Sequence, residues 1–481
     1  MSGRDTAVFL PHKGGFIVKQ FSKLSGVAAV MLAALALQVQ IQDDVSLSGE
    51  AFTRTLQWTP GVAGSTLALD KVTVDTAVKG HAGVLASTAE NNTITVRNSA
   101  IKGGDTGYAL RFDSVTGSQI RVENTDLSTK GGRSHIYQNT LLSDSSVTLK
   151  DSSLTGGARG FFVENAGHGS EITLDNTSIG DTGDSGALVS TMTGSVLNIT
   201  NSSVIAGEES GLYMKLLTGA MLNILKGSTI TGGGTGAFLT YLTGRSCVNI
   251  SESAFTGQQY GIQVYAMTDS AFDLMNTSAV STDGVALYLG QAVSSSLSIV
   301  HATLTGKEYG LLAELNDSEM TIESSVFTAE DGIDLRGHDS NIAITGTQTT
   351  SLLMNGSRQT VDIADSGLGN VEISGQFTIP EDTKGDNLFN ITTSKLTELF
   401  IGAGGGGAGR NTVNLSDSEV ISEGNAITFQ DTSNNIINIR NSSIRGYIHN
   451  SVDDDGSGEP TGGIINLDNS HFEGKVVTGR E

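Results

Sequence analysis

The sequence predicts an all-β chain that winds into a right-handed parallel β-helix, with about 25 residues in each coil. Two patterns that recur at this interval support the prediction, because a fixed repeat of this length is typical of stacked equivalent units. The first pattern is a short alternating strand, apolar-x-apolar, and the second is a glycine followed by an apolar strand. The alternating strands begin at Ile94, Ile120, Val147, Ile172, Leu197, Leu222, Val248 and Phe272, and the glycines are Gly107, Gly160, Gly186, Gly211, Gly236, Gly261, Gly284 and Gly310.

The residues of one coil predict its strands and turns, taken in chain order. Side chains alternate between the two faces of a strand, so Leu197 and Ile199 point inward. The Asn-Ser pair at 201–202 forms a corner, because Asn tolerates left-handed backbone geometry and both side chains bond locally to the backbone. Gly211 permits a tight re-entry into the next strand, and the Thr-Gly pair at 218–219 closes the coil. The strands are too short, and their alternation too clear, for helical repeats.

The composition fits a narrow, stacked core. The chain has 61 Gly but only 4 Pro, which favours frequent turns and few breaks in hydrogen-bonded strands. A repeat protein grows without a second core, so we expect one structural domain. Within it we expect a regular β-helix over 37–340, irregular coils with loops over 341–410, and further coils over 411–481 that stop within a coil.

The first 36 residues differ from the repeats. A basic stretch is followed by an apolar run over 24–37, in which Ala34 and Ala36 form a small-x-small cleavage site. This order is typical of a secretory signal peptide, and the apolar run is shorter than the roughly 20 residues of a membrane span. We therefore expect residues 1–36 to be a signal peptide that directs export. A buried N-terminal helix is the alternative.

Charge and cysteine content exclude several functions. The chain carries 28 basic and 51 acidic residues, a net charge of −23, which is the wrong sign for binding nucleic acid or an anionic membrane. Cys247 is the only cysteine, so the chain has no internal disulfide, and we expect Cys247 to be a packed small residue. The acidic run at 453–455 has no further ligands spaced around it, and the histidines are scattered. We therefore expect a solvated loop, no metal site and no cofactor.

The repeat "LNITNSSVIAGEESGLYMKLLTG", together with the long leader and the scarcity of cysteine, resembles the passenger domain of pertactin-like or AIDA-like autotransporters, which have the pectin-lyase type of β-helix. The resemblance implies a monomeric adhesin that reaches the surface of a Gram-negative bacterium, or the medium, through an outer-membrane translocator barrel. The barrel itself is not expected in this chain, because no series of amphipathic strands of about ten residues follows the repeats. A truncated gene, a split passenger and an excised fragment remain alternatives.

We therefore expect an exported, virulence-associated binding protein without catalysis, whose partner is a protein or glycan of a host cell or matrix. Tyrosines that recur after the second-pattern glycines are the candidate contacts, because an aromatic ring with a polar tip suits a partly wet interface. Packing at the edge of the coil is the alternative role for these rings. The candidates are Tyr213, Tyr241, Tyr265 and Tyr288.

Two other functions remain open. A carbohydrate-active enzyme, a polysaccharide lyase or hydrolase, would use carboxylates with a basic residue on one face, and "EDGIDLRGHDS" offers Asp331, Asp334, Arg336 and His338. A structural spacer would bind nothing. The protease-like string Gly-Asp-Ser-Gly at 183–186 is better explained as a coil loop and its repeat glycine, because no histidine and aspartate partners accompany it in a protease-sized segment.

Overall fold

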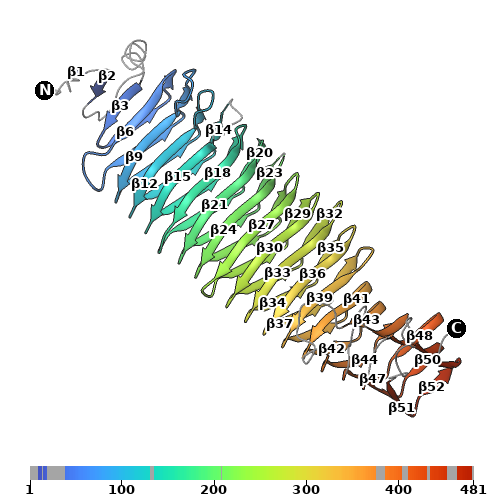
Figure 1. Cartoon of the computed structure of the whole chain (residues 1–481). Helices are drawn as coiled ribbons and strands as arrows, with labels where there is room; N and C mark the ends of the chain where they lie inside the picture. The colour runs from blue at the N-terminus through green and yellow to red at the C-terminus, as the bar shows by residue number, and fades with distance from the viewer. Residues whose placement is uncertain are drawn as a thin grey trace. The chain divides into compact units, whose positions relative to one another are not determined.

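The computed structural model describes residues 9–12, 15–18, 38–129, 135–206, 208–374, 385–402, 410–430, 434–451 and 463–478. Within these ranges the chain consists of strands and turns, with no helix. The strands stack in parallel in about 16 turns of about 25 residues each (Figure 1). The prediction of an all-β parallel β-helix with this repeat is therefore confirmed. No helix among the described residues has the length and apolar character needed to cross a membrane.

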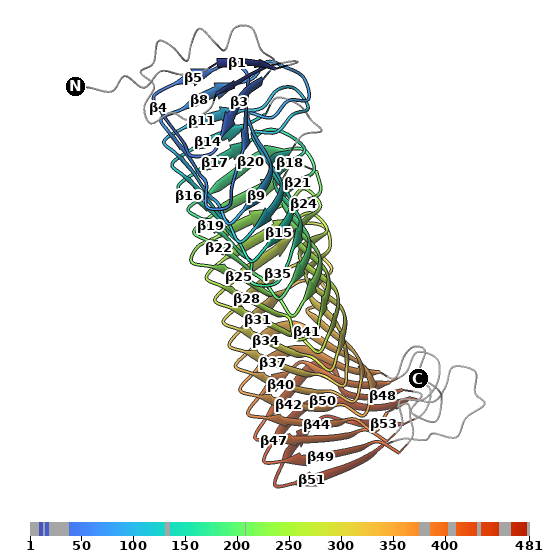
Figure 2. The ribbon, with the colours of Figure 1, turned by 90° about the vertical axis from the view of Figure 1, so that its left-hand side faces the viewer.

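The chain divides into two compact units, Met1–Gly257 and Gln258–Glu481. In each, a typical coil has three walls: a first wall of short alternating strands, a second wall of very short strands, and a third wall of long strands. In Figure 2 the first-wall strands of unit one lie above one another along one side of the coils. Like walls of successive coils pair in parallel register, as Ile172, Leu197 and Leu222 do in the first wall.

The strands of unit one have the following bounds. The first wall contains β4 (Val45–Ser48), β7 (Thr66–Asp70), β10 (Thr93–Arg97), β13 (Gln119–Glu123), β16 (Ser146–Lys150), β19 (Glu171–Asp175), β22 (Val196–Thr200), β25 (Met221–Leu225) and β28 (Cys247–Ser251). The second wall contains β5 (Ala51–Phe52), β8 (Thr73–Asp75), β11 (Ala100–Lys102), β14 (Asp126–Ser128), β17 (Ser153–Thr155), β20 (Ser178–Thr182), β23 (Ser203–Ala206), β26 (Thr229–Thr231) and β29 (Ala254–Gly257). The third wall contains β3 (Gln38–Gln42), β6 (Thr55–Thr59), β9 (Val84–Glu90), β12 (Leu110–Thr116), β15 (His135–Ser143), β18 (Arg159–Ala166), β21 (Ser185–Thr193), β24 (Ser210–Thr218) and β27 (Thr235–Thr243).

The strands of unit two follow the same plan. The first wall contains β31 (Ala271–Met275), β34 (Ser296–Val300), β37 (Glu319–Glu323), β40 (Asn341–Thr345), β42 (Thr360–Ala364), β44 (Leu388–Thr392), β47 (Thr412–Ser416), β49 (Ile436–Arg440) and β51 (Ile464–Asp468). The second wall contains β32 (Ser278–Ser281), β35 (Thr303–Thr305), β38 (Val326–Thr328), β45 (Lys395–Leu396) and β52 (His471–Glu473). The third wall contains β30 (Tyr260–Thr268), β33 (Val285–Val293), β36 (Tyr309–Asn316), β39 (Ile333–His338), β46 (Glu398–Gly402) and β53 (Val476–Thr478), while β41 (Gln348–Ser357), β43 (Gly367–Ser374), β48 (Glu419–Gln430) and β50 (Ser443–Ser451) run through both walls.

The core of each unit is a set of inward-facing apolar columns. In one coil of unit one, Leu197, Ile199, Val204 and Leu212 are all fully buried or nearly so. Each such side chain contributes roughly 1.5–3 kcal/mol by leaving water. The alternation predicted from the sequence therefore places the core correctly.

The predicted corner is also present. Asn201 has a positive φ of 48°, the left-handed conformation that Asn tolerates. Ser202 is buried, its Oγ accepts a hydrogen bond from the backbone N–H of Thr177 at 3.1 Å, and the same hydroxyl donates to the carbonyl oxygen of Thr200 at 2.9 Å. Equivalent serines recur in other coils and link each corner to the next one.

Gly211 is needed because of a close approach between coils. A Cβ at this position would lie 2.7 Å from the carbonyl oxygen of Thr231 and 2.8 Å from that of Gly236. Both obstacles are backbone atoms of the following coil, so a side chain cannot be fitted by a rotamer change. This is the tight re-entry that the repeated glycine predicts.

The coils of unit two become uneven after about residue 340. Corner residues Thr347 and Ser366 are joined by a hydrogen bond across 19 residues, whereas the next pair, Ser366 and Ser394, spans 28. The parallel pairing nevertheless continues through both intervals. Asn387, Asn411 and Asn435 form a buried side-chain column at one corner, with amide-to-amide hydrogen bonds of 2.9 and 3.1 Å.

Parts of the predicted leader and tail lie outside the described residues. Ala34, Ala36 and the acidic run 453–455 are among them. Within residues 1–36, only β1 (Phe9–His12) and β2 (Gly15–Val18) are described, as an antiparallel pair whose second strand lies beside β3. The signal peptide and the four region boundaries stay predictions. Cys247 is half-buried on the first wall, where its Sγ contacts Asn249 Oδ1 at 3.3 Å.

Candidate functional site

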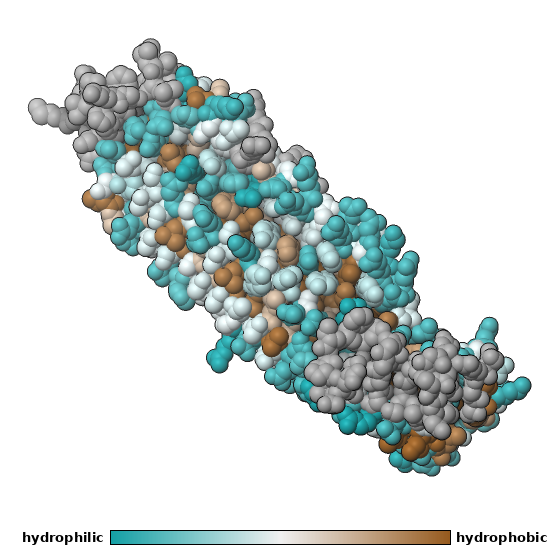
Figure 3. Space-filling model, viewed as in Figure 1, coloured by the Kyte–Doolittle hydropathy of each residue, from teal (hydrophilic) through white to brown (hydrophobic). Residues whose placement is uncertain are grey.

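The two candidate tyrosines of unit one project outward from the third wall. Tyr213 on β24 is in register with Leu188 on one side and Phe238 on the other. The rings of Tyr213 and Phe238 stack, with centroids 5.3 Å apart and planes inclined by 22°. Tyr241 on β27 is 43% exposed. These rings form an outward aromatic surface in addition to the core, and Figure 3 shows apolar patches among polar residues over the third-wall strands.

The two candidate tyrosines of unit two also lie on the third wall. Tyr265 on β30 is 50% exposed, and Tyr288 on β33 is half-buried against Tyr260, with ring centroids 5.4 Å apart. A Cβ on Gly290 would lie 3.0 and 3.1 Å from the ring and hydroxyl of Tyr288. The glycine therefore leaves room for the Tyr288 ring to lie against the strand. The Tyr288 ring thus lies on the outward side of its strand and also packs against its neighbours, which is the alternative role given above for these tyrosines.

Sequence reasoning missed three aromatic residues of these surfaces. They lie on third-wall strands near the predicted tyrosines: Phe238 within β27, Tyr260 at the start of β30 and Tyr309 at the start of β36. Tyr260 and Tyr309 directly precede the repeat glycines Gly261 and Gly310, which was the available signal. The register of Tyr260 with Val285, and of Val285 with Tyr309, brings these two tyrosines onto one side of unit two.

The structure brings together two of the four candidate enzyme residues. Asp334 on β39 is only 1% exposed, although it occupies an outward position of the strand. Arg336 Nη2 lies 2.6 Å from Asp334 Oδ2, and Arg336 Nε lies 3.1 and 3.2 Å from the two carboxylate oxygens. Asn355 Nδ2 donates to Asp334 Oδ1 at 3.2 Å. The buried carboxylate is thus held by one guanidinium and one amide.

The other two candidates lie apart from this pair. Asp331 is exposed in the turn before β39, and its carboxylate makes no ion pair with a described basic residue. His338 Nδ1 lies 2.9 Å from Asp339 Oδ2, and the same carboxylate receives Arg358 Nη2 at 2.6 Å. These bonds, chiefly those from Arg358, lower the pKa of Asp339 to about 2. The four residues do not converge on one point.

A further carboxylate lies on the same outward column as Asp334. Asp334 pairs with Leu353, which pairs with Glu372, so Glu372 lies two strands further along the same column. Burial raises the pKa of Glu372, and the charges of Asp334, Asp331 and Glu398 raise it further. A carboxyl group whose pKa is raised is better suited to donate a proton than one with an ordinary pKa.

The tyrosines of unit two lie in the same electrostatic environment. Burial raises the pKa of Tyr309, and Asp334, Asp331 and Glu308 add to the effect. Burial likewise raises the pKa of Tyr288, with Tyr260 and Glu314 contributing. Arg336 opposes the rise at both phenols. We call this surface the acidic tyrosine face; it comprises Tyr260, Tyr288, Tyr309, Glu308, Glu314, Asp331, Asp334 and Glu372, with Arg336 among them.

Unit one carries a different aromatic cluster at the start of its long strands. His135 lies between Tyr108 and Phe162, with ring centroids 5.9 and 4.8 Å away. The guanidinium of Arg159 lies 5.4 Å above the Phe162 ring, and that of Arg111 lies 5.2 Å above Tyr108. Burial, and then the charge of Arg159, lower the pKa of His135 to about 4. The imidazole is therefore neutral near pH 7.

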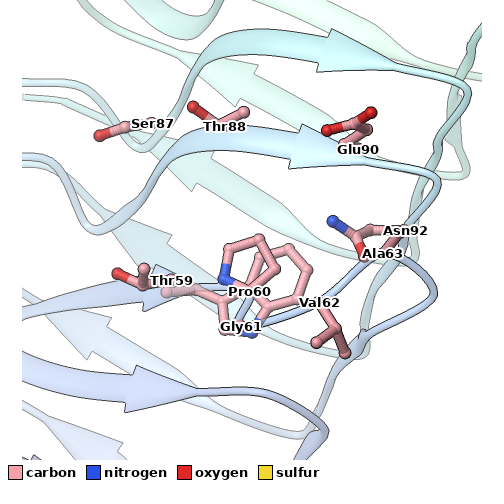
Figure 4. A pocket seen from close by; sticks show the side chains of 10 residues that line it. Thr59, Pro60, Gly61, Val62, Ala63, Ser87, Thr88, Glu90 and Asn92 are labelled. Atoms are coloured by element: carbon pink, nitrogen blue, oxygen red, sulfur yellow. The ribbon is translucent and has the colours of Figure 1, made fainter.

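A pocket lies at the first coils of unit one (Figure 4). Its volume is about 240 Å³, below the roughly 300–1,000 Å³ of typical small-molecule sites. Trp58, which lines it, is 1% exposed, and its indole N–H donates to the carbonyl oxygen of Asp43 at 3.0 Å. The pocket is lined by Trp58, Thr59, Pro60, Gly61, Val62, Ala63, Ser87, Thr88, Glu90 and Asn92.

The protease-like string has structural roles here. Ser185 is 1% exposed within β21, in register with Arg159 of the preceding coil. Asp184 forms an ion pair with Arg159 at 3.3 Å. Gly186 is enclosed, since a Cβ there would lie 2.5 Å from Val204. No group of three potential metal ligands occurs among the described residues.

No protein-family model matches the chain, and a search of curated proteins finds no similar sequence.

Proposed function

We propose that this protein is an exported, autotransporter-type passenger that acts as an adhesin on the bacterial surface or in the medium, without catalysis. The observation that carries the proposal is the outward stack of Tyr213 on Phe238 in unit one. Aromatic rings left at a surface are typical anchors of protein and glycan interfaces, because they bury a large area with little loss of conformational freedom.

The architecture is consistent with this role. The apolar columns inside the coils supply the stability, so the outward faces of the third wall are available for contacts. A single cysteine and a basic-apolar leader fit export of an unfolded chain, as the resemblance to passenger domains implies. The expected partner is a protein or glycan of a host cell or its matrix.

The experiment is a binding assay with the purified protein on cultured epithelial cells and on immobilised matrix proteins. The double variant Tyr213→Ser/Phe238→Ser is compared with wild type. The control is Tyr447→Ser, which removes a 42% exposed tyrosine from unit two. We expect the double variant to lose most of the binding and the control to keep it, with unchanged circular dichroism in both. Equal binding by all three proteins, or no binding by wild type, would overturn the proposal.

A carbohydrate-active enzyme is the second candidate, because Glu372 has a raised pKa and lies near Asp334 in unit two. A proton donor and a second carboxylate are the minimal parts of a glycosidase. The test is release of reducing ends or unsaturated products from a panel of plant and bacterial polysaccharides. Activity that disappears in Glu372→Gln would support the enzyme. The absence of product with wild-type protein across the panel would reject it.

A further inference from the structure

The acidic tyrosine face contains several carboxylates without a basic partner. Glu308 and Asp331 are exposed, and Glu314 and Glu372 are half-buried. None of these four forms an ion pair with a described basic residue, although Glu314 accepts a hydrogen bond from Asn316 at 3.2 Å and Lys307 is the neighbour of Glu308 in the chain. The face therefore carries a net negative charge beside half-exposed tyrosine rings.

Arg336 indicates which chemical group this surface accepts. Its guanidinium binds Asp334 through two nitrogens, and its side chain is still 50% exposed. The hydrogen bonds to Asp334 raise the pKa of Arg336, and Tyr309 and Tyr288 add to the effect. A planar cation held by a buried carboxylate is thus already part of the fold. Of the four carboxylates without an ion pair, Glu314 is in register with Arg336 on the neighbouring strand, and Glu372 lies two strands beyond Asp334.

The order of the elements makes the surface continuous along unit two. β30, β33, β36 and β39 are consecutive third-wall strands, each paired in parallel with the next. Adjacent strands are separated by roughly 4.8 Å, so the tyrosines and carboxylates succeed one another at short intervals. Within one column Tyr260 and Tyr309 lie two strands apart with Val285 between them, and Tyr288 and Asp334 lie two strands apart with Leu312 between them. An extended peptide that crosses these strands would therefore meet a ring or a carboxylate on alternate strands of each column.

We propose that the acidic tyrosine face binds an extended, arginine- and lysine-rich segment of a partner protein. The proposal rests on the adhesin function and specifies the chemistry of one partner. Carboxylates pair with the guanidinium and ammonium groups, and the tyrosine rings contact the same cations through their π faces. A polyanionic ligand is repelled by the same charges, and a neutral glycan gains nothing from them.

The test uses the full chain and a fluorescent oligoarginine peptide, with an oligoglutamate peptide and a neutral β-glucan oligosaccharide as comparison probes. Binding is measured by fluorescence anisotropy at low and at high salt. The variant Glu314→Gln/Asp331→Asn removes two charges from the face. The matched control, Glu319→Gln/Glu323→Gln, removes two exposed charges from the first wall of the same unit. A third variant, Tyr288→Leu/Tyr309→Leu, removes the rings without changing the charge.

We expect the oligoarginine peptide to bind wild type and to bind more weakly at high salt. The face variant should weaken binding by about tenfold, and the ring variant should also weaken it, while the control stays near wild type. Equal loss in the face variant and its control would overturn the proposal, because it would mean attraction to net charge alone. Preference for the glucan or for oligoglutamate would overturn it as well.

The adhesin proposal and this inference fail in different ways. If Tyr213→Ser/Phe238→Ser abolishes cell binding while the face variant binds oligoarginine like wild type, the adhesin stands and the basic partner is rejected. If no variant changes binding to cells, but the face variant alone loses binding of the oligoarginine peptide, the adhesin proposal is rejected and the peptide-binding site is supported.

Discussion

The carboxylate of Asp334 and the guanidinium of Arg336 form a close ion pair, with Nη2 and Oδ2 2.6 Å apart, and the two partners differ sharply in exposure. The Asp334 side chain is 2% exposed, whereas that of Arg336 is 50% exposed. Removal of one partner therefore has a different consequence from removal of the other, because only the carboxylate is left buried without its counter-charge.

We expect Arg336→Met to destabilise unit two by about 2 kcal/mol, since Asp334 keeps only its hydrogen bond from Asn355. Asp334→Asn should cost less, because Arg336 can turn toward water. The measurement is the urea concentration at the unfolding midpoint for each variant. A larger loss in Asp334→Asn than in Arg336→Met would contradict this account.

The stability of unit one should fall as the pH drops below about 6.5, because His135 is held neutral in the folded chain. The pKa of His135 in the folded chain, about 4, lies below the ordinary value of 6.5 for histidine, so the unfolded chain binds more protons between these two pH values and acid favours unfolding. We expect His135→Gln to flatten the pH dependence of the thermal midpoint between pH 4 and 6.5. His471→Gln, at an exposed histidine of unit two, is the control, and an unchanged slope in His135→Gln would refute the prediction.

Gly211→Ala should lower the thermal midpoint, at a cost of about 2 kcal/mol, because the new Cβ meets backbone oxygens of the next coil. Gly180→Ala is the matched control, since no atom lies within 4 Å of a Cβ placed there. We expect that variant to stay within roughly 0.5 kcal/mol of wild type. Comparable losses at both glycines would argue against the close approach at Gly211.

Tyr137 and Asn139 are two buried polar residues in the core of unit one. Both residues are 0% exposed, and neither the Tyr137 hydroxyl nor the Asn139 amide makes a hydrogen bond of ordinary geometry, although burial raises the pKa of Tyr137 and the nearby Asn139 side chain opposes that rise. Asn139 is in register with Phe112 and Val163, which are apolar and fully buried. We expect Tyr137→Phe/Asn139→Val to raise the thermal midpoint of unfolding by a few degrees, because it removes buried polar groups and keeps the volume. A lower midpoint would mean that the two side chains contribute stabilising hydrogen bonds.

The leader should direct export in a Gram-negative host. We expect the secreted or surface form to begin after Ala36, and Ala36→Glu to block cleavage, since small residues are required at that site. Edman sequencing of the exported chain and fractionation of the cells measure both outcomes. An exported chain that still begins at Met1 would contradict the prediction.

Most of the fold could be predicted because each wall carries its own signal. Alternation places Leu197 and Ile199 inside, and the corner at Asn201 and Ser202 needs only local geometry. The buried column of Asn387, Asn411 and Asn435 was not predicted. An asparagine is typical of turns in a sequence. The burial of Asn387 and Asn411 is favoured because the next asparagine of the column accepts a hydrogen bond from each amide, and that neighbour is not visible in the sequence.

Less of the candidate site could be predicted, because its residues meet between coils. Asp334 and Arg336 are two residues apart on one strand, so their proximity was visible in the sequence. Glu372 and Asn355 lie one or two coils further on, where coil lengths vary between 19 and 28 residues. Because the coil length is not constant there, the period of the sequence does not predict which residues pair between coils. The neighbours of Asp334 are known only from the strand pairing in the structure.

The corner serines have a consequence for how such a molecule changes in length. Ser202 accepts the backbone N–H of Thr177, and Ser228 in turn accepts that of Ser202. Loss of residues 196–220 would put Ser228 in the place of Ser202 and leave every donor with an acceptor. Whole windings can therefore be lost or duplicated in evolution at little energetic penalty, because the corners on either side still pair. Homologues should differ from one another by full windings, and the outward tyrosines should be shifted by the same steps.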